Sequence, residues 1–297
     1  MADDGPREGE PGGDERTSER LAASVAREAA RQLAETLRPG LHLVATPIGN
    51  LGDITLRALA ALARADLICC EDTRHSRTLL AHYGIDRPLR PYHEHNADAE
   101  RPRILAELAQ GRRVALISDA GTPLVSDPGY KLVRAAADAG HGVWALPGAS
   151  AVLAGLAVAG LPTDTFLFAG FLPPKSAARR TRLDELSKVP ATLVLFEAPT
   201  RLADMLEDVA RVLPGRSVAG ARELTKRFEE VRRGTAADLA TAIAAEPVKG
   251  ESVVLSGPPA AGAEAASDAE IEAALAPLLA TTSLRDAARD VAGRLNA

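Results

Sequence analysis

Glycines, prolines and carboxylates are concentrated in residues 118–129, directly after the apolar run RVALIS. The segment holds Asp119 beside Gly121 and ends in Asp127 and Gly129. A glycine lets the backbone approach a ligand closely, and a carboxylate accepts hydrogen bonds from ribose hydroxyls or from an ammonium group. We therefore predict that this segment binds a small ligand. For Asp127 alone, capping of the following helix is an equal alternative.

Two further glycine-containing segments also follow apolar runs. Residues 46–53 contain two glycines and end in Asp53, but their spacing is not the G-x-G-x-x-G pattern of dinucleotide-binding turns. Residues 147–150, PGAS, place Ser150 near the start of an expected helix. Taken singly, each segment fits a turn followed by a capped helix as well as it fits a ligand contact.

A cluster of charged side chains, EDTRH, occupies residues 71–75 after the second apolar run. It includes Glu71, Asp72, Arg74 and His75. Such a cluster at the end of a buried strand is unfavourable unless water or a bound molecule compensates it. The pattern favours a functional role over a structural one.

Two histidines, His93 and His95, stand one residue apart in the segment HEHN, which ends in Asn96. Histidine pairs can bind metal, but a metal site also needs further ligands at a suitable spacing, and none is evident. We predict no metal, and leave open a substrate contact or a solvated loop.

Basic residues are frequent between residues 175 and 233, where thirteen bases face nine acids. Arg222, Glu223 and Lys226 lie at the end of an expected strand, and three arginines lie on an expected polar helix at residues 176–188. Such residues form either a solvated face or a phosphate-binding surface.

The elements that would hold these segments alternate between strand and helix in the first half of the chain. Apolar runs predict strands at 41–46, 65–70, 113–118 and 142–146. Helical spacing predicts helices at 54–64 (capped by Asp53), 75–83, 98–110, about 129–140, and after Gly148. This alternation predicts a parallel sheet of the α/β class.

The second half has a different pattern. We predict strands at 166–171, 192–197, 217–222 and 251–256, a polar edge strand at 228–234, and helices at 268–279 and 283–295. Residues 1–20 have a composition typical of disorder, and residues 21–38 favour a helix. The predicted division is an N-terminal extension (1–39), an α/β domain (40–160), a second α/β domain (161–257) and a helical tail (258–297).

Composition and charge exclude several classes of protein. The chain is 46% hydrophobic and 25% charged, so it can build real cores, but only 3% is aromatic, which disfavours a nucleic-acid surface built mainly on stacking. The net charge of −5 argues weakly against nucleic acid, although residues 175–233 carry a net charge of +4. The adjacent Cys69 and Cys70 are expected to be buried thiols in a reducing cytoplasm, and no secretory or membrane segment is evident.

Eight motifs in order make the chain recognisable. They are LVATPIGNLGDITLRAL, EDTRHSRTLL, YHEHN, SDAGTPLVSDPGY, LPGAS, GLPTDTFLFAGFLP, ARELTK and RGT. Together they resemble the ribosomal RNA small subunit methyltransferase I family, of the tetrapyrrole methylase-like superfamily. The resemblance runs from about Leu41 to Leu255.

The resemblance implies a fold and a reaction. It implies two α/β domains, the first with a mostly parallel and the second with a mixed sheet, a cleft between them for S-adenosylmethionine, and a cytoplasmic homodimer. It implies methylation of the 2′-hydroxyl of a cytidine in 16S rRNA near the decoding centre of the small ribosomal subunit. Residues 1–39 precede the family's usual start, and the C-terminal helical region looks shorter than usual.

The resemblance also implies site residues. The cofactor is expected to contact Asp119, Ala120, Gly121, Leu124, Val125 and Ser126, and less specifically Ser150, Ala151, Phe196, Ala221 and Thr235. Candidate proton acceptors for the weakly nucleophilic hydroxyl are Glu71, Asp72, His93, His95 and Glu223. Candidate RNA contacts are Asn50, Arg74, His75, Asn96, Arg222 and Lys226.

Two alternatives remain open. One is a methylase of tetrapyrroles from the same superfamily, although a macrocycle would favour a large apolar floor over these polar loops. The other is a scaffold that binds S-adenosylmethionine and RNA without turnover.

Overall fold

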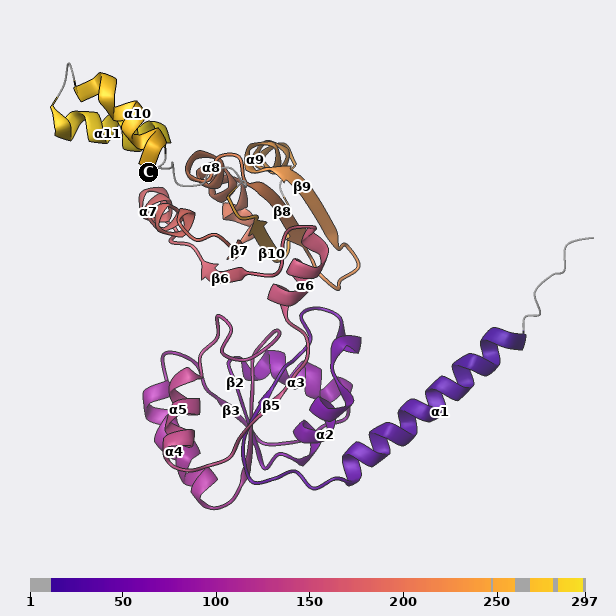
Figure 1. The fold of residues 1–297 in the computed structure, drawn as a ribbon. Coiled ribbons are helices and arrows are strands. Elements are labelled where there is room, and N and C mark those ends of the chain that lie inside the picture. Colours follow the sequence, from indigo (N-terminus) through magenta and orange to yellow (C-terminus); the bar gives the residue numbers. More distant parts are fainter. Residues whose placement is uncertain (1–11, 247, 260–267, 280–282, 296–297) are drawn as a thin grey trace, which may run out of the picture. The chain divides into compact units, whose positions relative to one another are not determined.

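The computed structural model describes residues 12–246, 248–259, 268–279 and 283–295. Its internal contacts divide the chain into two compact units, Met1–Ala154 and Gly155–Ala297 (Figure 1). The division falls inside one helix, α6 (Ala151–Ala159), and the predicted boundary at residues 160 and 161 lies just after that helix.

Unit 1 is built on a parallel five-stranded sheet in the order β3-β2-β4-β1-β5. Val44 of β1 pairs with Ile117 of β4 and with Leu146 of β5, so these strands end at one edge. The prediction of a parallel sheet is confirmed. The strands are β1 (Gly40–Val44), β2 (Leu67–Cys70), β3 (Leu89–Pro91), β4 (Arg113–Ile117) and β5 (Val143–Leu146).

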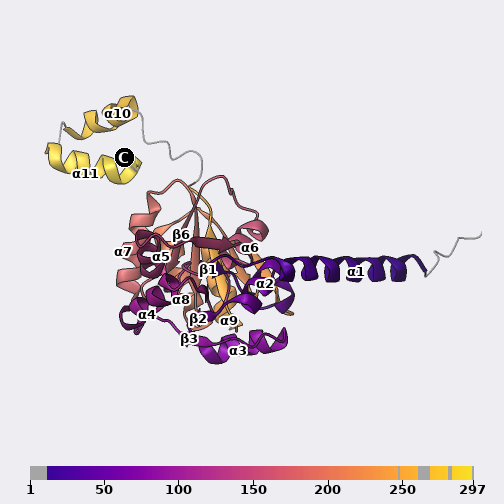
Figure 2. The same cartoon turned by 90° about the horizontal axis from the view of Figure 1, so that it is seen from below.

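Helices cover both faces of this sheet because the strands carry apolar side chains on both faces. On one face Ala115 and Ile117 pack with residues of α2 and α3, and on the other Val114 and Leu116 pack with residues of α4 and α5. Cys69 and Cys70 are free, buried thiols in these cores. The helices of the unit are α1 (Gly12–Ala34), α2 (Leu56–Arg64), α3 (Thr73–His82), α4 (Ala97–Ala109) and α5 (Tyr130–Asp138). Helix α1 contacts α2 (Figure 2).

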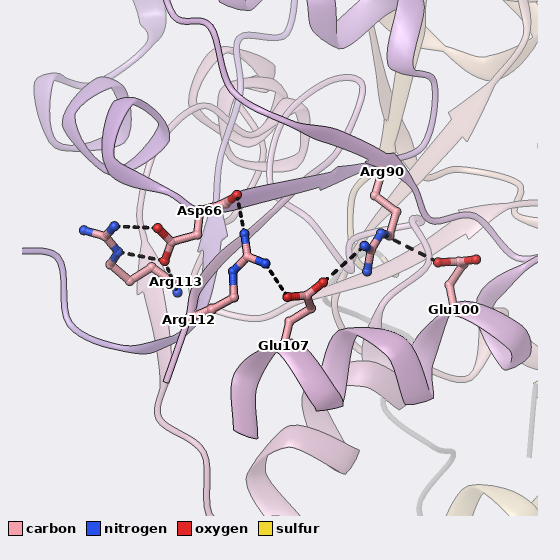
Figure 3. A network of polar contacts seen from close by, with 6 residues as sticks. All are labelled: Asp66, Arg90, Glu100, Glu107, Arg112 and Arg113. Carbon is pink, nitrogen blue, oxygen red and sulfur yellow. Dashed lines mark hydrogen bonds and ion pairs between the residues drawn. The ribbon is translucent and has the colours of Figure 1, made fainter. Parts of the chain in front are cut away.

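A chain of ion pairs fixes the amino-terminal ends of β2 and β4 to α4 (Figure 3). Asp66, just before β2, takes two hydrogen bonds from the Arg113 guanidinium, at 2.5 and 2.9 Å, and one from the Arg113 backbone N–H at 2.8 Å. Arg112 pairs with Glu107 of α4 at 2.6 Å, and Arg90 of β3 pairs with the same carboxylate at 3.2 Å. The network therefore holds β2, β3, β4 and α4 together on the side of the sheet opposite the ends of β1, β4 and β5.

Replacing Asp66 by asparagine is expected to lower the free energy of unfolding by about 1–2 kcal/mol at pH 7. The Arg113 guanidinium lowers the pKa of Asp66 to about 2. Because Asp66 has a lower pKa in the folded protein than in the unfolded chain, where it is near 4, its ionised carboxylate stabilises the fold above about pH 4. This contribution to the free energy of unfolding is lost as the pH falls from about 4 to 2.

Urea titrations at pH 7 and at pH 3 measure this effect, and the gap between wild type and Asp66→Asn should narrow at the lower pH. The matched control is Asp138→Asn, because the Arg134–Asp138 pair is highly exposed and should contribute less than about 0.5 kcal/mol. Equal losses in both variants would contradict a special role for the Asp66 network.

Unit 2 is built on a mixed five-stranded sheet in the order β6-β7-β10-β8-β9, as the resemblance implied. Only the β6–β7 pair is parallel. The polar strand β9 lies at the edge, as predicted. The strands are β6 (Phe166–Phe171), β7 (Thr192–Glu197), β8 (Ser217–Arg222), β9 (Glu230–Thr235) and β10 (Ser252–Ser256).

The core of unit 2 lies on one face of this sheet, where Leu195 and Val254 pack against Met205 and Leu239. On the other face Val253 lies against α6, since a Cβ on Gly155 would come within 3.1 Å of its side chain. The remaining helices are α7 (Ser176–Ser187), α8 (Leu202–Val212), α9 (Ala236–Ala245), α10 (Asp268–Leu279) and α11 (Leu284–Leu295).

Three expectations about local structure are corrected, and three elements were not predicted. Helix α1 begins at Gly12, so residues 12–20 are helical and not disordered; residues 1–11 lie outside the described part. Asp53 does not cap α2, because Thr55 accepts from the Ala58 N–H at 3.1 Å. Asp127 does not cap α5, whose N-cap is Gly129 with no side-chain cap. Strand β3 and helices α8 and α9 were not expected.

Candidate functional site

The segment 118–129 is fixed to the loop after β1 by an isolated pair of backbone hydrogen bonds. Thr46 and Gly121 exchange N–H···O=C bonds of 2.9 and 3.0 Å. The Thr46 hydroxyl donates to the Ser118 carbonyl at 3.1 Å, and the Ser118 hydroxyl donates to the Gly121 carbonyl at 2.9 Å. The loop is therefore a rigid structure at the carboxyl edge of the sheet, where α/β folds bind ligands.

The backbone of this loop is strained in a way typical of binding sites. Leu124 and Ser126 have left-handed φ angles of 77° and 62°, which cost about 1–3 kcal/mol each in residues other than glycine. Gly121 has φ +86°, and a Cβ there would lie 3.2 Å from the Ile48 side chain and 3.6 Å from the Ala149 carbonyl. Glycine at position 121 therefore holds this conformation with the least strain and the closest packing.

The turn after β5 lies against the same loop. The Thr122 hydroxyl donates to the Ala149 carbonyl at 3.2 Å, and a Cβ on Gly148 would come within 2.9 Å of Ala45. Ser150 accepts from the Leu153 N–H at 3.5 Å, and Ala151 begins α6. Three of the loops that the sequence singled out thus meet at one edge.

The loop after β2 joins them through a carboxylate. The Asp119 Oδ1 accepts from the Asp72 backbone N–H at 3.1 Å. Burial raises the pKa of Asp127 to about 7. The neighbouring Glu71 carboxyl, which shares a hydrogen bond with Asp127, and the charge of Asp119 contribute to this rise. Asp127 therefore lies near two other carboxylates, those of Glu71 and Asp119.

Sequence reasoning missed the role of Asp127. Its position before Pro128-Gly129 is equally typical of a helix cap, and nothing in the local pattern brings it to Glu71, more than fifty positions away. Only the meeting of the β2 and β4 loops reveals the pair.

Asp72 and Arg74 are engaged with each other. Asp72 caps α3 by accepting from the Arg74 N–H at 2.8 Å, and its other oxygen pairs with the Arg74 guanidinium at 2.8 Å. These contacts hold the pKa of Asp72 well below its usual range, so its carboxylate is a weak base. Arg74 is 88% exposed, and His75 in the first turn of α3 is also exposed.

The segment after β3 is closed by Asn96, whose side chain accepts from the His93 N–H at 2.9 Å and donates to the Pro91 carbonyl at 3.0 Å. The rings of His93 and His95 meet edge to face with centroids 6.0 Å apart. Among the described residues no group of three or more His, Cys, Asp and Glu side chains is arranged to hold a metal ion.

Asn50 accepts from the Gly52 N–H at 3.0 Å and so shapes the loop after β1.

In unit 2, ion pairs engage three of the predicted charged site residues. Lys226 lies 2.9 Å from Glu223 and 3.2 Å from Glu251, and the Lys226 contact lowers the pKa of Glu223. Arg222 pairs with Glu230 at 2.8 Å. Glu223 is thereby a weaker base than an isolated carboxylate.

The three other predicted residues of unit 2 occupy different environments. Phe196 and Ala221 flank Val253 across β7, β10 and β8, so the three share one face of the sheet. Phe196 also contacts Phe168 and Phe171, with ring centroids 4.9 and 5.7 Å apart. Thr235 is the N-cap of α9 and accepts from the Asp238 N–H at 3.1 Å.

Comparison with known proteins agrees with this architecture. The family model described as Tetrapyrrole (Corrin/Porphyrin) Methylases matches residues 40–240. A relative from Mesorhizobium japonicum, named "Ribosomal RNA small subunit methyltransferase I", is 55% identical over 87% of this chain and 88% of its own length.

Solved structures show the same fold at low identity. The uroporphyrin-III C-methyltransferase of Thermus thermophilus has a TM-score of 0.53 and 23% identity over 74% of this chain and 94% of its own. A second structure of that enzyme, titled as complexed with S-adenyl homocysteine, has a TM-score of 0.50 and 20% identity over 73% of this chain and 97% of its own.

The fold and the family model place the chain in a defined class, the S-adenosylmethionine-dependent methyltransferases of the tetrapyrrole methylase fold. Within that class, the 55% identity over most of both sequences shows that it belongs to the ribosomal RNA small subunit methyltransferase I family.

Proposed function

We propose that the protein transfers the methyl group of S-adenosylmethionine to the 2′-hydroxyl of a cytidine ribose in 16S rRNA near the decoding centre. The observation that carries the proposal is the rigid carboxyl-edge site of unit 1, in a chain so similar to a relative named for rRNA methylation. When bound, the donor supplies an electrophilic methyl group on its sulfonium sulfur.

The residues of the loop fit such a donor. Its strained turn exposes Ala120 and Ser126 beside the Asp119 carboxylate, which suits ribose hydroxyls or an amino-acid ammonium group. A side chain at position 121 would fill the space next to Ile48 and Ala149, where the backbone must stay open. The roles of Leu124 and Val125 in this loop, of Ser150 and Ala151, and of Phe196, Ala221 and Thr235 in unit 2 remain part of the proposal.

Among the candidate proton acceptors, we favour Glu71. Asp72 and Glu223 have lowered pKa values because each is held by a cation. Glu71 instead faces Asp127, an acid that gives up its proton only near pH 7. Removal of the hydroxyl proton by a base is worth about 10²–10⁴-fold in rate. His93 and His95 remain the alternatives.

Arg74 is the favoured phosphate contact because it is highly exposed at the site and has the planar fork that matches phosphate. Arg74→Ala is expected to lose RNA methylation while keeping affinity for S-adenosylmethionine. Methyl transfer to small subunits and calorimetry measure the two effects. Arg103→Ala, which removes an exposed arginine of α4, is the control, and normal methylation by Arg74→Ala would make the 71–75 loop merely structural.

Arg222 and Lys226 would contact RNA only by exchanging their present carboxylate partners for phosphate. His75, Asn50 and Asn96 are proposed to line the RNA path, the two asparagines by shaping their loops. Pairing of two copies and a cytoplasmic location stay predictions, and sedimentation at several concentrations tests the first.

The experiment that tests the function is to map 2′-O-methyl groups in 16S rRNA from cells that lack the gene. One cytidine mark near the decoding centre should disappear and return with the wild-type gene. An unchanged map would refute the proposal and turn attention to a tetrapyrrole substrate, for which precorrin-like acceptors are the assay. If a variant that cannot transfer methyl restores the missing 2′-O-methyl mark, the protein would act as a non-catalytic scaffold rather than as the methyltransferase.

A further inference from the structure

An arginine-lined groove lies in unit 1 apart from the loops of the candidate site. It has a volume of about 310 Å³ and lies between the end of α1, the linker to β1, helix α2 and strand β5. Because Arg38 precedes β1 and Arg64 ends α2, it extends toward the amino-terminal edge of the sheet, opposite the loops. The lining residues used here are Glu35, Arg38, His42, Arg57, Arg64 and Trp144.

The groove has an excess of positive charge. The Glu35 carboxylate is engaged by Arg31 at 2.6 Å, whereas no ion pair of Arg38, Arg57 or Arg64 occurs within the described ranges of the chain. Arg57 and Arg64 are seven residues apart on α2 and so share a face, about 10 Å apart along the helix axis. The spacing exceeds one phosphate group, so the two arginines would contact different phosphates of one strand.

A buried histidine adds a hydrogen-bond acceptor. His42 is 3% exposed, and its Nε2 donates to the Arg38 carbonyl at 2.9 Å. Its Nδ1 therefore carries a lone pair, and burial lowers the pKa of the ring, so the ring stays neutral at pH 7. Nδ1 has no partner among the described residues, and neither has the buried Arg64 Nε. A hydroxyl next to a phosphate would supply both partners.

An aromatic ring completes the groove. Trp144 is 36% exposed, and the Arg38 guanidinium lies 5.1 Å above its ring. Trp144 is the single tryptophan of the chain, so its fluorescence reports on this groove.

We propose that this groove binds the phosphodiester backbone of a single RNA strand, with Arg57 and Arg64 on phosphates and His42 accepting from a ribose hydroxyl. The choice of RNA over a free phosphate compound rests on the proposed function. The groove would act as a second RNA contact, away from the methyl-transfer chemistry.

The test titrates Trp144 fluorescence with a short single-stranded RNA, with cytidine monophosphate and with inorganic phosphate. The RNA should change the fluorescence saturably and bind at least about tenfold more tightly than either small anion, since it spans both arginines. In Arg57→Ala/Arg64→Ala the response should be lost, and the slope of log K against log salt should fall by about 0.7 per phosphate contact removed. Arg134→Ala on α5 is the matched control.

Three results would overturn the proposal: no fluorescence response to any phosphate ligand, an equal RNA response in the double variant, or a response to cytidine monophosphate but not to RNA. Thermal unfolding of the double variant, expected at the wild-type temperature, excludes misfolding as the cause of a lost response. Affinity for S-adenosylmethionine should also be unchanged. Because Trp144 fluorescence needs no methyl transfer, failure of the groove and failure of the proposed function are told apart.

Discussion

Replacing Asp119 by alanine should weaken S-adenosylmethionine binding by about 100-fold, which corresponds to about 2.7 kcal/mol. The change removes a carboxylate from the proposed donor site and also the acceptor that holds the Asp72 N–H at 3.1 Å. Asp119→Asn separates these effects, because an amide oxygen keeps the acceptor and loses only the charge. Calorimetry should therefore place Asp119→Asn between wild type and Asp119→Ala.

A valine at position 121 should abolish donor binding by a different route. Gly121 has φ +86°, a conformation that β-branched residues hardly adopt, and its Cβ would press on Ile48. The bridge to Thr46 would be lost with it. Gly140→Val is the matched control, because Gly140 has φ +77° with open space around it. Wild-type affinity in Asp119→Ala or Gly121→Val would refute the cofactor assignment.

Glu71→Gln should lower the rate of methyl transfer by about 10²–10⁴-fold while leaving donor affinity near the wild-type value. In the proposed account Glu71 takes the proton of the ribose hydroxyl. Below about pH 7 Asp127 is protonated and donates to Glu71, which weakens it as a base. Above pH 7 Asp127 is ionised and no longer donates to Glu71, so the rate should rise through this pH.

Asp127→Asn tests the coupling of the two acids. Asparagine still donates to Glu71 but cannot lose its proton, so the rise in rate near pH 7 should vanish. Because the folded pKa of Asp127 is raised, its contribution to stability is full below pH 4 and is lost as the pH rises through about 7. The variant should therefore be more stable than wild type at pH 8. A normal rate in Glu71→Gln, or an unchanged pH profile in Asp127→Asn, would move the search to His93 and His95.

Most of the fold could be predicted because its signals are local. The apolar runs of β1, β2, β4 and β5, and the Gly/Pro breaks between them, indicate a parallel sheet without knowledge of any contact. Strand β3 escapes this reasoning because it has three residues and ends in Pro91. Helix α8 has a signal that can be read in the sequence, because Leu202, Met205, Leu206 and Val209 have helical spacing, and all four are buried.

The candidate site was predictable in its parts but not in its contacts. Glycine and carboxylate types mark the loop at 118–129, and the carboxyl edge of the sheet brings it to the loops after β1, β2 and β5. The partners of individual charges depend on distances that spacing does not encode. Spacing alone makes Asp72 a candidate base, but its pairing with Arg74 weakens it as one. Spacing alone makes Asp127 a candidate helix cap, but in the fold it contacts Glu71.

One measurement tests the central claim directly. The purified protein is mixed with tritiated S-adenosylmethionine and small ribosomal subunits from cells that lack the gene, and the digested 16S rRNA is analysed for labelled nucleosides. We expect label in 2′-O-methylcytidine, and no label when the protein is the Gly121→Val variant. Label in a methylated base, or no label from a wild-type protein that binds the donor, would contradict it.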